Sequence, residues 1–290
     1  MVIVSLLLCV LFFTMFERKF MSYIQLRKGP NKVGFLGILT PVADTVKLVI
    51  KTSSIVISSN QLLFFFGPFL AIFVLFLMWS IMPFFFFNNV YFFSLVVFFC
   101  LSSINVYSVL SSGWGSNSKY SMLGAFRGVA QVISYEIILI FVGFFPICSH
   151  GGYQMFSFFE NNFFFLMWFF SLFCVWLVSC VAETNRSPFD FAEGESELVS
   201  GFNTEYGALE FAFLFLGEYG QIIFISSLSV LIFSYGYSGY EYILFGVLLA
   251  VGFIWFRSSF PRFRYDLFME IAWNWGLVFL VFYIFYIVSF

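Results

Sequence analysis

The chain has 290 residues, of which 62% are hydrophobic and 10% charged, and its formal net charge is −2. Its mean hydropathy is +0.99. These values exclude an ordinary soluble domain, and the continuous apolar runs exclude a transmembrane barrel, whose strands alternate apolar and polar residues. We therefore predict an all-α polytopic membrane protein that forms a single integral membrane domain over residues 1–290.

Apolar runs of spanning length predict about eight transmembrane helices. They lie at about 2–26, 61–83, 90–111, 122–146, 163–182, 207–234, 240–257 and 267–289. The basic residues Arg18 and Lys19 follow the first run instead of preceding it, and no small-residue cleavage site comes after it. This order favours an uncleaved first span over a signal peptide.

The thirteen lysines and arginines are distributed unevenly along this map. All fall in the loops 27–60, 112–121, 183–206 and 257–266 or at the adjoining span ends, whereas 84–89, 147–162 and 235–239 hold none. By the positive-inside rule, the basic loops face the cytoplasm or the mitochondrial matrix. With eight spans, both termini lie on the opposite side.

An amphipathic helix is predicted between the first two spans. Thr40 is a suitable N-cap and Pro41 fits the first helical position. One face carries Asp44, Lys47, Lys51 and Ser54, and the other carries Val42, Val46, Val49, Ile50 and Ile57. The helix should lie flat in the inner membrane interface, and a packed cytosolic helix is the alternative.

Several acidic residues fall inside the predicted spans. Glu136 and Glu218 lie deep in the fourth and sixth spans, and Glu210 and Glu270 lie within about a turn of the inner face. A charge at the bilayer centre costs about 2.5–3.5 kcal/mol, so such residues usually pair, line water, or bind protons and ions. For Glu136 and Glu218 a function is favoured over structural pairing. For Glu210 and Glu270 a function and a structural role are equally supported.

The loop 183–206 is unusually acidic for its place between two spans. It holds six acids against the single base Arg186, a local charge of −5. Ser187 and Asp190 have the spacing of a capping box, with Pro188 at the first helical position, so a short helix is predicted. Asp190, Glu193 and Glu197 would then share a face and repel one another. A proton relay and a solvated surface for a basic partner both fit this pattern.

The chain offers little for binding a metal or a prosthetic group. Its five cysteines form no Cys-x-x-Cys pair, His150 is the only histidine, and there is no glycine-rich phosphate loop. Neither a metal site nor a redox cofactor is expected on this chain.

A set of strings in the basic loops and at the span ends identifies a family. They are ERK (17–19), QLRKGPN (25–31), GWGSNSKY (113–120), RGVAQVISYE (127–136), AETNRSPFDFAEGESELVSGFNTEY (182–206) and PRFRYD (261–266). In this order they resemble the chain 1 family of NADH–ubiquinone oxidoreductase, the core membrane subunits of respiratory complex I. The resemblance covers nearly the whole chain.

The resemblance implies a ubiquinone access channel between the first span, the amphipathic helix and the sixth span. Quinone-binding residues would be Arg18, Arg27, Asp44, Arg186 and Arg264. For Arg18 and Arg27, anchoring of lipid headgroups is an equally supported alternative. The proton relay would consist of Glu136, Asp190, Glu193, Glu197, Glu205 and Glu218. Quinone reduction would change the charge at the head of this relay.

The resemblance also implies partner subunits and a cellular location. NADH, flavin and iron–sulfur clusters would be held by other subunits, and this chain would contact quinone-reducing peripheral subunits, antiporter-like membrane subunits and lipids. The mitochondrial inner membrane is the expected location, with the bacterial plasma membrane as the alternative. The 50 phenylalanines agree with a T-rich coding strand, as in some organelle genomes.

Three other functions remain open. The membrane anchor of an energy-converting hydrogenase has a related fold, but the intact 25–31 and 183–206 strings favour the quinone branch. A free-standing ion or proton transporter is suggested by Glu136 and Glu218, but no inverted repeat supports it. A structural anchor with inert acids is the third.

Overall fold

The computed structural model describes residues 2–53, 57–83, 91–150, 152–155, 157–160, 169–192, 194, 198, 200–233 and 239–288. No strand occurs among these residues. The longer helices are α1 (Val2–Ile24), α2 (Thr40–Ile50), α3 (Gln61–Ile81), α4 (Ser94–Gly115), α5 (Lys119–His150), α8 (Phe170–Glu183), α10 (Ala208–Phe233), α11 (Gly239–Ser259) and α13 (Leu277–Val288). The shorter elements are η1 (Phe35–Gly37), α6 (Ser157–Glu160), η2 (Gly201–Asn203), α12 (Tyr265–Glu270) and η3 (Ile271–Gly276).

Six stretches of the described helices are long and apolar enough to cross a membrane. They are Gln61–Ile81, Ser94–Gly115, Lys119–Cys148, Ala208–Phe233, Tyr240–Ser259 and Tyr265–Phe285. α1 has 23 residues but contains the charged residues Glu17, Arg18 and Lys19, and the described part of α8 has 14 residues. Both coincide with predicted spans. The prediction of an all-α polytopic membrane protein is confirmed.

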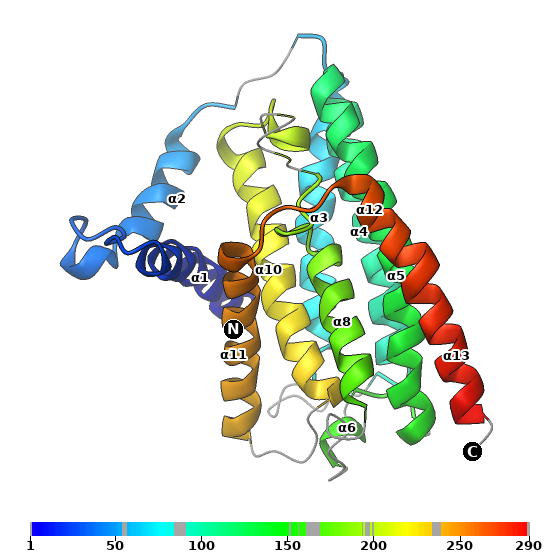
Figure 1. Cartoon of the computed structure of the whole chain (residues 1–290). Coiled ribbons are helices and arrows are strands. Elements are labelled where there is room, and N and C mark those ends of the chain that lie inside the picture. The colour runs from blue at the N-terminus through cyan, green and yellow to red at the C-terminus, as the bar shows by residue number, and fades with distance from the viewer. Residues whose placement is uncertain are drawn as a thin grey trace.

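The long helices form one bundle (Figure 1). α3, α4, α5, α8 and α10 run side by side, with α11 on one flank and α13 on the other, while α1 is strongly tilted against the bundle. α2, the end of α4 and the segment after α8 gather at one end, whereas α6 and the C-terminal end of α13 lie at the other. This arrangement agrees with the division into basic and non-basic loops.

The core lies where α3, α4, α5, α8 and α10 meet. Leu75, Leu139, Leu172, Trp176 and Phe224 are fully buried there. Apolar side chains on the other faces remain exposed, as expected for helices that face lipid. The core holds the end of α8 against α5, which positions the acidic segment that follows.

Two local features differ from the sequence prediction. The N-cap of α2 is Leu39 and not Thr40, because the Thr40 hydroxyl donates backward to the Gly37 carbonyl (2.7 Å) and Thr40 is already helical. Pro41 does occupy the first turn. The last predicted span is divided by a π-helical turn, η3, which begins directly after Glu270. Such π turns are frequent at functional sites, and hydropathy does not reveal them.

Candidate functional site

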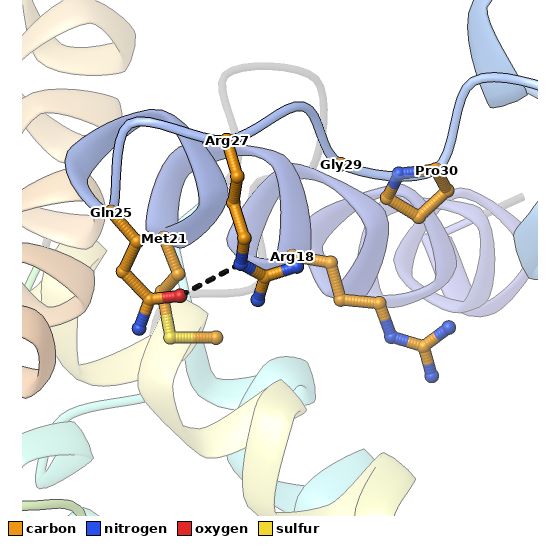
Figure 2. Close-up of a pocket in the computed structure, with 6 residues that line it drawn as sticks. All are labelled: Arg18, Met21, Gln25, Arg27, Gly29 and Pro30. Atoms are coloured by element: carbon orange, nitrogen blue, oxygen red, sulfur yellow. Dashed lines mark hydrogen bonds between the residues drawn. The ribbon is translucent and has the colours of Figure 1, made fainter.

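A cavity of about 340 Å³ lies beside the turn that joins α1 to α2. Its described lining residues are Arg18, Met21, Gln25, Arg27, Gly29 and Pro30. Gln25 and Met21 lie on one side, and Pro30 and the guanidinium of Arg18 on the other (Figure 2). Arg27 Nε donates to Gln25 Oε1 at 3.0 Å. The cavity therefore combines the apolar side chains of Met21 and Pro30 with two cations.

The predicted quinone-binding residues are only partly brought together. Arg18 and Arg27 line the cavity, and Arg18 Nη1 forms a 2.7 Å salt bridge with Asp44 on α2. Arg264 instead pairs with the exposed Asp266 at 3.0 Å. Neither it nor Arg186 is among the described lining residues of the cavity.

A second group of charges, the ionic junction (Glu17, Arg186 and Arg257), connects α1, the acidic segment and α11. Glu17 is buried, with 3% exposure, and it accepts hydrogen bonds from Arg186 Nη1 at 3.3 Å and from Arg257 Nη1. The guanidinium of Arg186 also lies 4.2 Å from the centroid of the Tyr219 ring on α10. Segments separated by up to 240 positions are thus joined at one carboxylate.

The electrostatics of Arg186 reflect this environment. Burial has the largest single effect and lowers the pKa of its guanidinium, but its neighbours, first among them the Glu17 carboxylate, together raise it by more, so the net pKa lies above the ordinary value. Tyr219 and Glu218 raise this pKa further. Arg186 is therefore a permanent cation that lies within electrostatic reach of a predicted relay residue, Glu218.

The helix predicted after Ser187 does not form. Residues 184–190 form turns, and the Ser187–Pro188 peptide bond is cis. Tertiary contacts prevail over the local capping signal, because the Phe189 ring stacks on Phe268 with centroids 4.2 Å apart. Asp190 is buried and forms an ion pair with Arg262 at 3.3 Å. Glu193 and Glu197 lie outside the described residues, so the predicted shared face is untested.

Glu136, on α5, is 8% exposed and accepts a hydrogen bond from the Ser102 hydroxyl at 3.3 Å. Glu183, the last residue of α8, is equally buried, and its Oε2 has no hydrogen-bond partner among the described residues. The two carboxylates are near enough for their charges to repel each other. Protonation of either group relieves that repulsion, which favours binding of a proton at this site.

Two further relay candidates are partly exposed. Glu218 is half-buried on α10, and Glu205 is half-buried before Tyr206. The Tyr206 hydroxyl lies 2.9 Å from the Phe64 carbonyl and 3.3 Å from the Ser112 carbonyl, which fixes the end of the acidic segment to α3 and α4. The described candidates thus lie along both ends of this segment and on the adjoining helices.

Comparison with known proteins gives the family. A family model described as NADH dehydrogenase matches residues 1–288. The chain belongs to the NADH dehydrogenase family. This confirms the family resemblance predicted from the sequence.

Several relatives of this NADH dehydrogenase family chain carry the name NADH-ubiquinone oxidoreductase chain 1. The protein from Anopheles gambiae is 44% identical over 295 residues, which cover 100% of this chain and 93% of the relative. The protein from Branchiostoma lanceolatum is 46% identical over 278 residues, 93% of this chain and 88% of the relative. The protein from Heterololigo bleekeri is 46% identical over 289 residues, covering 93% and 89% respectively.

Sequence reasoning overlooked three charged residues of this family member. Glu17 lies within the first predicted span, so the search for acids inside spans could have found it, but the adjacent Arg18 and Lys19 made it resemble an interfacial charge. The sequence marks Arg257 only as one of the basic residues of the positive-inside pattern. Glu183 belongs to the acidic loop but not to the predicted relay, because its burial at the end of α8 is a tertiary property.

The salt bridge between Arg18 and Asp44 should contribute little to stability. Both side chains are at least half exposed, at 57% and 50%, and exposed pairs contribute only about 0–1 kcal/mol. We expect Asp44→Asn to lower the free energy of unfolding of the isolated chain by less than about 1 kcal/mol. Denaturant titration in detergent measures this, and a loss above about 2 kcal/mol would contradict it.

Proposed function

We propose that this chain, as a membrane subunit of NADH–ubiquinone oxidoreductase, forms the ubiquinone access channel and the carboxylate relay that couples quinone reduction to proton translocation. The observation that carries the proposal is the burial of Glu136 and Glu183 within electrostatic reach of each other. Family membership and the names of the relatives support the reaction class.

The cavity beside α1 supports the channel. A long-tailed quinone requires an apolar path from the lipid with a polar end, and Met21 and Pro30 supply apolar surface next to Arg18 and Arg27. Cations suit a quinone headgroup because reduction places negative charge on its oxygens, which a nearby guanidinium stabilises. Asp44 holds Arg18 through its carboxylate, and we assign Arg186 and Arg264 supporting positions outside this cavity.

The arrangement of acids supports the relay. Reduction of the quinone would change the charge near the ionic junction, and Arg186 is electrostatically coupled to Glu218. A unit charge at about 4–6 Å is worth several kcal/mol in a low effective dielectric, which is enough to move a proton between coupled carboxylates. We propose that protons pass among Asp190, Glu193, Glu197, Glu205, Glu218, Glu183 and Glu136.

The same proposal sets the partners and the location. Other subunits would hold NADH, flavin and iron–sulfur clusters, and quinone-reducing peripheral subunits and antiporter-like membrane subunits would contact this chain. The enzyme would lie in the mitochondrial inner membrane, in agreement with the animal origin of the relatives. Ubiquinone would be bound as substrate.

Glu136→Gln tests the relay, because glutamine keeps the hydrogen bond to Ser102 but cannot release a proton at neutral pH. In enzyme reconstituted into liposomes, we expect the rotenone-sensitive NADH:ubiquinone reductase rate to stay within about twofold, which is less than half a kcal/mol in activation free energy. We expect the protons pumped per electron to fall by at least half. Quinone reduction and vesicle acidification are measured on the same preparation.

Glu136→Asp is the matched control, since it keeps a titratable group one methylene closer to α5, and its pumping should exceed that of Glu136→Gln. Glu197→Gln extends the test to the part of the loop outside the described residues. If both glutamine variants keep full quinone reduction and full pumping, the relay proposal fails. If rotenone does not inhibit quinone reduction by the unmodified enzyme, the proposed channel is contradicted instead.

A further inference from the structure

The acidic segment that follows α8 packs against one face of α5. Gly124 and Gly128 are four residues apart and therefore share this face. A Cβ atom built on Gly124 would lie 2.8 Å from the Ala192 carbonyl oxygen, and one on Gly128 would lie 2.7 Å from the Ala192 Cβ. Both distances are shorter than real Cβ contacts, so the segment reaches α5 only because these two residues lack side chains.

Gln131 continues this face three residues after Gly128 and is fully buried. Its Nε2 donates to the Ala182 carbonyl at 2.7 Å and to the Phe189 carbonyl at 2.8 Å. One amide group thus holds the backbone on both sides of the turn 183–188. The turn cannot open while both hydrogen bonds persist.

The orientation of this amide is fixed by its partners. Both partners are carbonyl oxygens, which only the NH₂ group can satisfy, and a flipped amide would place Oε1 against two other acceptors. Gln131 Oε1 has no partner among the described residues, so no donor competes for the opposite orientation. Of the two amide orientations, only this one satisfies both the Ala182 and the Phe189 carbonyl.

The two bonded carbonyls have one more property in common. Ala182 directly precedes Glu183, and Phe189 directly precedes Asp190. Gln131 also lies only five residues before Glu136 on the same helix. A single side chain of α5 therefore fixes the backbone next to two acids of the segment, relative to the helix that carries a third.

We propose that Gln131 is a positioning residue that sets the separation of Glu183 and Asp190 from Glu136 and thereby permits proton transfer along the relay. This inference rests on the proposed function, in which those carboxylates exchange protons. Proton transfer depends steeply on geometry, so a displacement of about 1 Å is enough to slow it. Gln131 itself exchanges no proton, because an amide does not titrate at neutral pH.

The test compares three variants in the reconstituted enzyme. Gln131→Met fills the same volume without a donor, Gln131→Asn keeps the amide on a shorter arm that reaches only one carbonyl, and Gln221→Met changes a buried glutamine of α10 as a matched control. We expect protons pumped per electron to fall at least threefold in Gln131→Met, to fall less in Gln131→Asn, and to stay unchanged in Gln221→Met. The rate of quinone reduction should remain within twofold in all three.

The readouts separate positioning from folding. A purely structural role would lower the amount of assembled enzyme on native gels and would reduce both activities together, whereas a positioning role lowers the pumping ratio of correctly assembled enzyme. If the pumping ratio of Gln131→Met equals that of the unmodified enzyme while Glu136→Gln is uncoupled, the positioning role is wrong and the relay stands. If Glu136→Gln also pumps fully, the proposed function fails first.

Discussion

Replacing Glu17 by glutamine is expected to prevent stable assembly of the enzyme. The substitution leaves Arg186 and Arg257 next to each other without their shared carboxylate, and the Arg186 side chain is only 12% exposed. Removal of one partner from a buried ion pair costs about 3–5 kcal/mol, mostly because the remaining charge is desolvated and unpaired. That loss is a large fraction of the stability of a typical domain, which is about 5–15 kcal/mol.

The prediction is tested by the amount of assembled enzyme on native gels and by the midpoint of thermal inactivation. A second substitution should restore part of the loss, because Glu17→Gln with Arg257→Gln leaves one cation without the carboxylate instead of two, and that cation still lies against the Tyr219 ring. Asp266→Asn is the control, since it removes a carboxylate from an ion pair whose side chains are 79% and 70% exposed. Glu17→Gln enzyme that assembles and resists heat normally would show that the ionic junction is not a structural requirement.

The span map and the sidedness of the loops could be predicted because both depend on local properties. Twenty apolar residues cross a bilayer whatever their partners, and lysines and arginines avoid translocation one loop at a time. α3 and α10 accordingly end within two residues of the predicted spans. Hydropathy could not predict η3, because a π-helical turn changes the backbone without changing the composition.

The candidate site was only partly predictable, because its essential contacts join distant segments. Ser187 and Asp190 carry a strong local signal for a helix, yet two hydrogen bonds from Gln131 and stacking on Phe268 hold the chain in turns. Nothing near Gln131 in the sequence distinguishes it from another buried polar residue. The sequence shows which acids fall in or next to apolar spans, but only packing shows which of them, such as Glu183, bury an oxygen that has no partner among the described residues.

Gly37→Ala is expected to abolish most ubiquinone reduction while leaving the peripheral part of the enzyme active. Gly37 has φ +77°, and a Cβ atom there would lie 2.2 Å from the Pro30 carbonyl oxygen. The left-handed conformation alone costs a non-glycine residue about 1–2 kcal/mol, and a backbone contact this short forces the turn apart. Because Pro30 lines the cavity, the displacement should distort the entrance that we assign to the quinone.

The reductase rate with a long-tailed ubiquinone should therefore fall at least tenfold, a change of about 1.4 kcal/mol in transition-state stabilisation. NADH oxidation by a water-soluble acceptor, which needs no quinone channel, should remain because the NADH site belongs to other subunits in the proposed function. Gly246→Ala is the matched control: nothing lies within 4 Å of a Cβ atom at that helical glycine of α11. There alanine should be neutral or stabilising by up to about 1 kcal/mol. Full reduction of long-tailed ubiquinone by Gly37→Ala would place the quinone entrance away from the α1–α2 turn, because a channel bounded by Pro30 cannot keep its shape after this clash.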